Sequence, residues 1–143
     1  MVCYGNICRS PMAEVLMQAA LHNRLGDRHD FLVTSAGTNA FDGGPASSPG
    51  VQAMAQRGLD LSRHRSRALT KAMIRRADRV ICMTASHRRS VLEMVPEAAA
   101  KTITLGDDVP DPLGGTLAEY EAVARLIEER VEALADEIAG ETE

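Results

Sequence analysis

The sequence predicts an α/β fold, a three-layer sandwich in which a short central parallel sheet carries helices on both faces. Segments with apolar residues at helical spacing alternate with short apolar runs typical of buried strands. Apolar residues make up 45% of the chain and aromatic residues only 3%, so the core must be mainly aliphatic. The 143 residues fit one domain, over 1–143.

Each element has a sequence signal at one or both of its ends. Ser or Thr residues suited to N-capping precede helices, Pro11 is expected at the first position of the first helix, and glycines are expected to end helices. The N-capping residues are Ser10, Thr84 and Thr116, and the closing glycines are Gly26, Gly58 and Gly140. The predicted helices are 10–25, 48–58, 70–77, 84–96 and 116–140, and the predicted strands are 31–35, 79–83 and 102–105.

The first twelve residues form the most informative stretch of the chain. Gly5 and Asn6 lie between Cys3 and Arg9, and both tolerate a positive φ, so the backbone can coil with its N–H groups turned inward. A helix follows directly, and a helix N-terminus attracts anions. The same field is expected to hold the sulfur of Cys3 as a thiolate. Arg9 supplies a planar cation suited to two oxygens of a phosphate, so the stretch predicts a nucleophile beneath a bound phosphoryl group.

The loop after the last predicted strand offers candidates for a general acid. Asp107, Asp108 and Asp111 lie there, and Pro112 restricts Asp111 to extended backbone. Taken alone, these residues are better explained as loop formers. A phosphate ester, however, needs a proton on its leaving oxygen while the thiolate attacks, and an aspartic acid can supply it.

The run from Cys3 to Glu14 closely resembles the phosphate-binding loop and first helix of the low-molecular-weight protein tyrosine phosphatases. The resemblance covers nearly the whole chain and includes the pair Asp111-Pro112. It implies that Cys3 attacks phosphorus, that Arg9 and the loop amides stabilise the phosphoryl oxygens, and that Asp111 protonates the phenol. It implies a phosphocysteine intermediate, inorganic phosphate as product, and no cofactor or metal.

The same resemblance assigns supporting roles around the nucleophile. The phosphate-binding loop includes Tyr4, Gly5, Asn6, Ile7, Cys8 and Ser10. Asn6, Ser10, Ser35 and His64 match a hydrogen-bond network that shapes this loop and orients Ser10 toward the thiolate. Without the resemblance, His64 would be interpreted as a surface histidine. Cys8 resembles a second thiol that can trap oxidised Cys3 as a disulfide.

Two departures from the family pattern affect what we expect. Only Met1 and Val2 precede Cys3, so the first central strand is expected to be truncated, with the true start upstream or a partner chain filling the gap. Leu113 follows Asp111-Pro112 where the family often has aromatic residues, so that wall of the pocket is expected to be low. Tyr4, Phe41 and Leu113 are the predicted pocket residues; for Phe41 a loop anchor and a pocket wall are equally supported.

The sequence supports other activities less well than phosphotyrosine hydrolysis. A protein-arginine phosphatase has the same loop but a small Thr in place of Ile7, and an arsenate reductase would need a further thiol besides Cys82. An inactive phosphotyrosine-binding module would lack the acid or the nucleophile, and both are present. A zinc site is disfavoured because no second compact ligand pair appears among the four histidines, which are His22, His29, His64 and His87.

Composition limits the compartment and partners. No apolar run approaches the roughly 20 residues that span a bilayer, and no signal-peptide pattern opens the chain. A net charge of -4 gives no case for binding nucleic acid or anionic membrane. Three cysteines argue against a secreted disulfide framework, so a cytoplasmic protein is expected, as a monomer or a dimer.

Overall fold

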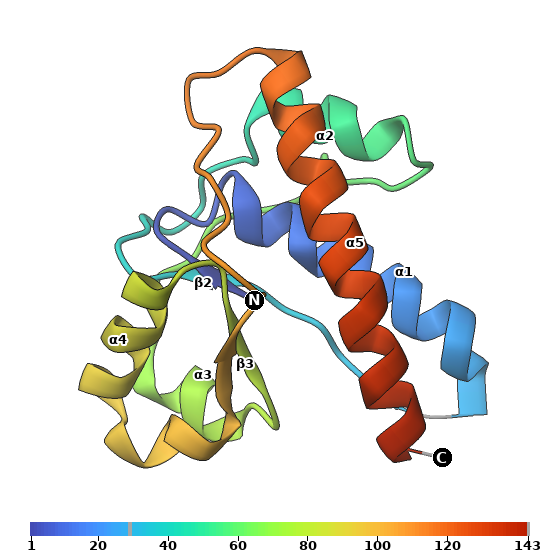
Figure 1. Ribbon diagram of the computed structural model, residues 1–143. Helices are drawn as coiled ribbons and strands as arrows, with labels where there is room; N and C mark the ends of the chain where they lie inside the picture. Colours follow the sequence, from blue (N-terminus) through green and yellow to red (C-terminus); the bar gives the residue numbers. More distant parts are fainter. Residues whose placement is uncertain (29, 143) are drawn as a thin grey trace.

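A computed structural model describes residues 1–28 and 30–142 (Figure 1). The helices and strands alternate along the chain as the sequence predicts. The strands are β1 (Val2–Cys3), β2 (Ala36–Gly37), β3 (Val80–Cys82) and β4 (Thr102–Thr104). The α-helices are α1 (Arg9–Leu25), α2 (Ser48–Ala55), α3 (Lys71–Arg76), α4 (Ala85–Met94) and α5 (Leu117–Thr142), and the 3-10 helices are η1 (Gly26–Arg28) and η2 (Pro96–Lys101).

The four strands form one parallel sheet in the order β2-β1-β3-β4. Although β1 has only two residues, it lies in the centre, with Val2 opposite Ala36 on one side and Cys82 on the other. The carboxyl ends of all strands therefore meet at one edge, which is where ligands bind in open α/β sheets. Cys3 is the last residue of β1 and lies at that edge.

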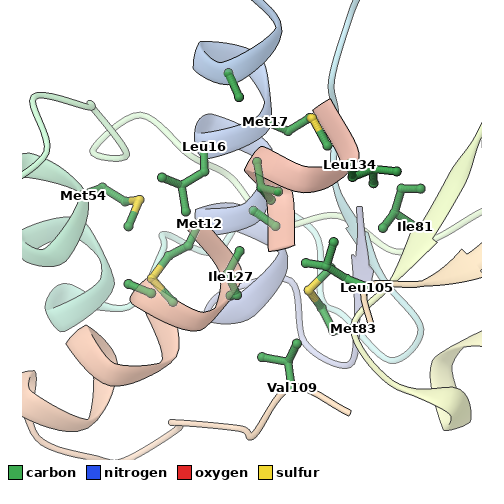
Figure 2. Close-up of a cluster of buried hydrophobic side chains, with 14 of the residues drawn as sticks. Met12, Leu16, Met17, Met54, Ile81, Met83, Leu105, Val109, Ile127 and Leu134 are labelled. Atoms are coloured by element: carbon green, nitrogen blue, oxygen red, sulfur yellow. The ribbon is translucent and has the colours of Figure 1, made fainter. Parts of the chain in front are cut away.

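Side-chain alternation divides the core between the two faces of the sheet. Helices α1, α2 and α5 pack on one face around Ile81 and Met83 of the β3 region (Figure 2). Helices α3 and α4 cover the other face, where Val80 and Cys82 pack against Ile74 and Val91. Because successive strand residues point to opposite faces, three residues of β3 serve both layers. The predicted three-layer α/β architecture is confirmed.

Three predicted boundaries were wrong. Strand 31–35 is not formed; the paired residues are Ala36–Gly37, and 31–35 is irregular chain along a groove of about 710 Å³ at the amino ends of the strands. Helix α1 begins at Arg9 with Cys8 as its N-cap residue, since the Ser10 hydroxyl is bonded elsewhere. Helix α5 continues through Gly140 to Thr142, whose hydroxyl donates to Ile138 O.

Other predicted helix ends are confirmed by their hydrogen bonds. Thr84 and Thr116 accept from the N–H three residues on, at 3.2 Å each. After α2, Gly58 has φ +74°, and its N–H and that of Leu59 donate back to Ala55 O and Met54 O. This pair of bonds is the Schellman motif, which needs a residue with positive φ such as glycine.

No helix within 1–28 and 30–142 is both long and apolar enough to cross a membrane.

Candidate active site

The phosphate-binding loop, residues 3–10, connects the carboxyl end of β1 to the N-terminus of α1 (Figure 1). Cys3 is buried, and its sulfur lies 2.9 Å from Ser10 Oγ. The backbone N–H of Asn6 also donates to this sulfur, at 3.3 Å. Hydrogen-bond donors directed at a sulfur stabilise negative charge on it, as does the helix N-terminus that follows.

Asn6 is the centre of the network that holds this loop in shape. It has φ +56°, the only positive φ among the non-glycine residues that the structure describes, and it is completely buried. Its Nδ2 donates to Ser10 Oγ and to Ser35 Oγ, both at 2.9 Å. A left-handed backbone in a buried residue persists only when its surroundings hold it there.

Two further contacts to Asn6 come from the segment 64–67. The backbone N–H of Arg67 donates to Asn6 Oδ1 at 3.0 Å, and His64 Nε2 lies 2.7 Å from the Asn6 carbonyl oxygen. Because a carbonyl oxygen only accepts, His64 must donate with Nε2 protonated. The structure therefore brings together Asn6, Ser10, Ser35 and His64, as the family resemblance implied.

Gly37 allows the loop to approach β2 closely. A Cβ at this position would lie 2.5 Å from Tyr4 O and 2.9 Å from Asn6 N, closer than real Cβ atoms come. The adjacent N–H of Thr38 donates to Cys3 O at 2.9 Å. Gly37 is therefore required by close packing against the loop, a role that only the three-dimensional contact reveals.

Arg9 and Asp111 face each other across the site. Arg9 is buried, its Nη1 donates to Val109 O at 3.1 Å, and its Nη2 lies 3.5 Å from Asp111 Oδ2. Its Nε is buried and has no hydrogen-bond partner among the described residues. Nε and Nη2 form one edge of the guanidinium, so this edge can donate two parallel bonds to a tetrahedral oxyanion. Val109 N donates to Met83 O at 2.9 Å, which anchors the aspartate loop to the end of β3.

This arrangement is that of a known enzyme family. The model of the low molecular weight phosphotyrosine protein phosphatases matches residues 1–143. The chain belongs to this family. A probable low molecular weight protein-tyrosine-phosphatase, EpsP of Ralstonia solanacearum, is 35% identical over 92% of this chain and 89% of its own. The family resemblance predicted from residues 3–14 is confirmed, and phosphatases of this kind are hydrolases.

Solved structures of the family have the same fold. The low molecular weight protein tyrosine phosphatase of T. tengcongensis is 37% identical, with a TM-score of 0.88 over 95% of both chains. The YwlE arginine phosphatase of Geobacillus stearothermophilus is 35% identical, with a TM-score of 0.88 over 98% of this chain and 91% of its own. Similar relatives thus include phosphatases named for two different phosphorylated residues.

The second thiol of the loop differs electrostatically from a nucleophile. Burial raises the pKa of Cys8, although a hydrogen bond to the Tyr120 hydroxyl, 3.2 Å from its sulfur, opposes this shift. Burial also raises the pKa of Cys82 to about 12. Both cysteines are therefore protonated at neutral pH, and the Cys8 sulfur contacts Tyr120 of helix α5.

The predicted pocket residues, called the rim below, lie on the surface rather than in the core. Tyr4, Phe41 and Leu113 are all exposed, and Phe41 is 90% exposed, so it is not a loop anchor tucked against the body. The backbone of the Phe41 loop is held instead, because the Ser66 hydroxyl donates to Phe41 O and accepts from Gly44 N at 2.9 Å. Ile7 is half-buried within the phosphate-binding loop.

His87 lies close to the site. From the sequence it was a candidate only for a disfavoured zinc site. It lies in the first turn of α4, is 5% exposed, and has a buried Nδ1 without a hydrogen-bond partner in the described chain. Burial, and next the charge of Arg9, lower the pKa of His87 to about 4, while Asp108 and Asp111 oppose the shift. The imidazole is therefore neutral at physiological pH. Of the other histidines named for zinc, His29 lies outside the described residues.

Proposed function

We propose that this protein hydrolyses phosphotyrosine in proteins through a phosphocysteine intermediate. The observation that supports this most is the placement of Cys3 Sγ, with two hydrogen-bonding partners, in the same loop as Arg9, whose buried Nε has no hydrogen-bond partner among the described residues. A thiolate, an oxyanion-binding cation and a facing carboxyl are the three groups that such a displacement needs.

The first step transfers the phosphoryl group to the enzyme. The Cys3 thiolate attacks phosphorus, the S–P bond forms as the bond to the tyrosine oxygen breaks, and Asp111 gives its proton to that oxygen. Arg9 and the inward N–H groups of residues 4–9 stabilise the equatorial oxygens. A phosphoryl group on Arg9 would compete with Asp111 for Nη2, now 3.5 Å from Oδ2, and so direct the carboxyl toward the leaving oxygen.

The second step regenerates the enzyme. Asp111, now ionised, accepts a proton from a water that attacks phosphorus as the S–P bond breaks, and inorganic phosphate leaves. Ser10 Oγ, 2.9 Å from the sulfur, can donate to the thiolate as it departs. Asn6, Ser35 and His64 serve as positioning residues, because they act on the nucleophile only through the shape of the loop. No metal or cofactor takes part in this scheme.

The rim supports phosphotyrosine as the substrate. Phosphotyrosine is long enough to bring its phosphate to Cys3, whereas phosphoserine would bring its own backbone against the rim. Tyr4, Phe41 and Leu113 offer apolar surface to an aromatic ring, with Ile7 deeper in the loop. The low wall at Leu113 predicts modest affinity for free phosphotyrosine. We expect the reaction in the cytoplasm, where the three free cysteines stay reduced.

Turnover of p-nitrophenyl phosphate and of a phosphotyrosine peptide tests the proposal. Wild type should release phosphate from both substrates, and Cys3→Ser should be inactive yet still bind phosphate or vanadate. Cys8→Ser is the matched control in the same loop and should retain substantial activity. An active Cys3→Ser variant would refute the assignment of the nucleophile.

A phosphoarginine side chain is the second candidate, because the arginine phosphatase of Geobacillus stearothermophilus is as similar to this chain as the tyrosine phosphatases are. Ile7 disfavours it, since an apolar side chain gives a guanidinium no hydrogen-bond acceptor, and an unpaired buried donor costs about 1–3 kcal/mol. Catalytic efficiencies on matched phosphotyrosine and phosphoarginine peptides, for wild type and Ile7→Thr, distinguish the two. A wild type that prefers phosphoarginine would overturn the tyrosine assignment.

A further inference from the structure

The basic run 63–67 lies beside the phosphate-binding loop and has no role in the chemistry above. His64 and Arg67 attach it to Asn6 at 2.7 Å and 3.0 Å, and Ser66 attaches it to the loop that contains Phe41. The run is therefore fixed between the phosphate-binding loop and one side of the rim. Its position relative to a bound phosphotyrosine is set by these contacts rather than by a flexible tether.

The three arginines of this run differ in what they contact. Arg67 turns inward and is half-buried, with its Nε donating to Ser35 O at 3.0 Å. Arg63 is exposed, but it lies near enough to the Asp60 carboxylate to help lower the pKa of that group. Arg67 therefore bonds within the protein, and Arg63 has a carboxylate nearby in its own segment.

Arg65 is the remaining cation. It is exposed, and no carboxylate in residues 1–28 or 30–142 lies within ion-pair distance of it. Its Nη1 donates to the carbonyl oxygen of His64 at 2.8 Å. This bond holds the guanidinium beside the residue whose ring contacts the phosphate-binding loop, and it leaves the other guanidinium N–H groups free to bind an anion.

The loop that contains Asp111 has the opposite charge. The loop 107–111 presents three exposed aspartates, Asp107, Asp108 and Asp111. On the basic side, Asp42 is the acidic residue of the Phe41 loop, and its Oδ1 accepts from Ala68 N at 2.9 Å. A peptide bound over Cys3 thus has an arginine without an ion pair to the described residues in the segment that contacts Asn6, and a cluster of carboxylates in the loop that faces Arg9. The two orientations of a charged peptide are therefore not equivalent.

We propose that Arg65 selects phosphotyrosine substrates that have an acidic residue close to the phosphotyrosine. This inference rests on the proposed function, since it concerns the sequence around the residue that is hydrolysed. The partner is a peptide carboxylate, because a guanidinium with free N–H groups binds a carboxylate through two parallel hydrogen bonds. The pair is solvent-exposed, so the preference should be about two- to fivefold and should weaken as salt is added.

The test compares phosphotyrosine peptides that carry glutamate or lysine on one side of the phosphotyrosine at a time, with neutral residues on the other side. Each catalytic efficiency is divided by that of the same variant on p-nitrophenyl phosphate, which has no flanking residues. On one of the two sides wild type should prefer glutamate, Arg65→Ala should lose this preference, Arg65→Lys should keep part of it, and Arg65→Glu should favour lysine.

Arg76→Glu is the matched control. Arg76 is an exposed arginine at the C-terminus of α3, along the groove at the amino ends of the strands. Arg76→Glu therefore changes the net charge by the same amount as Arg65→Glu, but at the end of the sheet opposite to the site. It should leave the peptide preference unchanged. A wild type without preference, or equal shifts in Arg65→Glu and Arg76→Glu, would overturn the role of Arg65. Loss of p-nitrophenyl phosphate turnover in wild type would instead refute the proposed function.

Discussion

At the carboxyl end of the central strand, every polar group of the Asn6 side chain has a partner: Oδ1 accepts from Arg67 N, and Nδ2 donates to Ser10 and Ser35. At the amino end of the same strand, the Met1 ammonium donates to Thr34 O at 2.9 Å, and burial lowers the pKa of this amino group. One end is a closed network and the other borders an open groove. The positive φ of Asn6 and the hydrogen bonds of its side chain thus lie at the end of the strand where the chemistry occurs, and the groove lies at the opposite end.

The largest effect should come from Asp111 at the closed end. Asp111→Asn removes the proton donor while keeping the size of the side chain. The rate on aryl phosphates with poor leaving groups should fall about 10²–10⁴-fold, and much less on those with good leaving groups, because these need little proton transfer. Rates across a series of substituted phenyl phosphates measure this. Equal losses for all leaving groups would make Asp111 a structural residue and Asp108 the next candidate.

Asn6→Ala should break the network itself. It leaves the Ser10 and Ser35 hydroxyls and the Arg67 N–H without this partner, and each unpaired buried group costs about 1–3 kcal/mol. We expect a drop of about 3 kcal/mol in the free energy of unfolding, measured with urea, and at least a tenfold loss of kcat. Asn39→Ala is the control, since the Asn39 side chain donates to the Tyr4 hydroxyl at the exposed surface. Equal losses in the two variants would contradict the role of the Asn6 side chain in holding the phosphate-binding loop.

His87 should make stability depend on pH. Its pKa is about 4 in the folded protein and near 6.5 when unfolded, so the unfolded chain binds the proton more readily. The stability contributed by the neutral ring is complete above pH 6.5 and is lost as pH falls toward 4. Between pH 7 and pH 4.5 the free energy of unfolding, measured with urea, should fall by about 2–3 kcal/mol in wild type. It should fall by less in His87→Gln. The exposed His22→Gln should unfold like wild type; identical pH profiles for all three proteins would contradict the burial argument.

The open end predicts the smallest effect. Placing Val-Ile before Met1 should move the amino group away from its buried position and cover apolar residues of the groove, such as Val33 and Val80. We expect the free energy of unfolding to rise by on the order of 1 kcal/mol with kcat unchanged. Ser-Ser in the same place is the control. Equal stabilisation by both extensions would show that the apolar lining of the groove is not what matters.

The contrast between the two ends also explains what the sequence could predict. Local signals located the helices correctly, because a Thr cap or the Gly58 turn involves bonds within a few residues. The strand predicted at 31–35 was wrong because strand pairing depends on a neighbouring strand, and on this side of the sheet the β1 residues pair with Ala36–Gly37. An apolar run alone does not specify where pairing begins.

The candidate site residues also divide into those that a local pattern predicts and those that depend on distant contacts. Cys3 and Arg9 follow from one short loop, but the roles of Ser35 and His64 came only from the family resemblance, since these residues lie 29 and 58 positions from Asn6. The local pattern predicted that the Ser10 hydroxyl caps a helix, whereas the family resemblance directed it toward the thiolate; in the structure it lies 2.9 Å from the Cys3 sulfur. Gly37 and His87 were missed because their significance lies in contacts with distant segments, which no local pattern records.

Cys3 is the covalent nucleophile in the proposed mechanism, and mass spectrometry of the trapped phosphoenzyme tests this most directly. Asp111→Asn should react with an aryl phosphate that has a good leaving group, but without its general base it should release phosphate slowly, so the intermediate accumulates. Rapid acid quench followed by digestion should then place one phosphoryl group on Cys3 and none on Cys8. A phosphoryl group on Cys8, or a burst of phenol without any phosphorylated cysteine, would contradict the account.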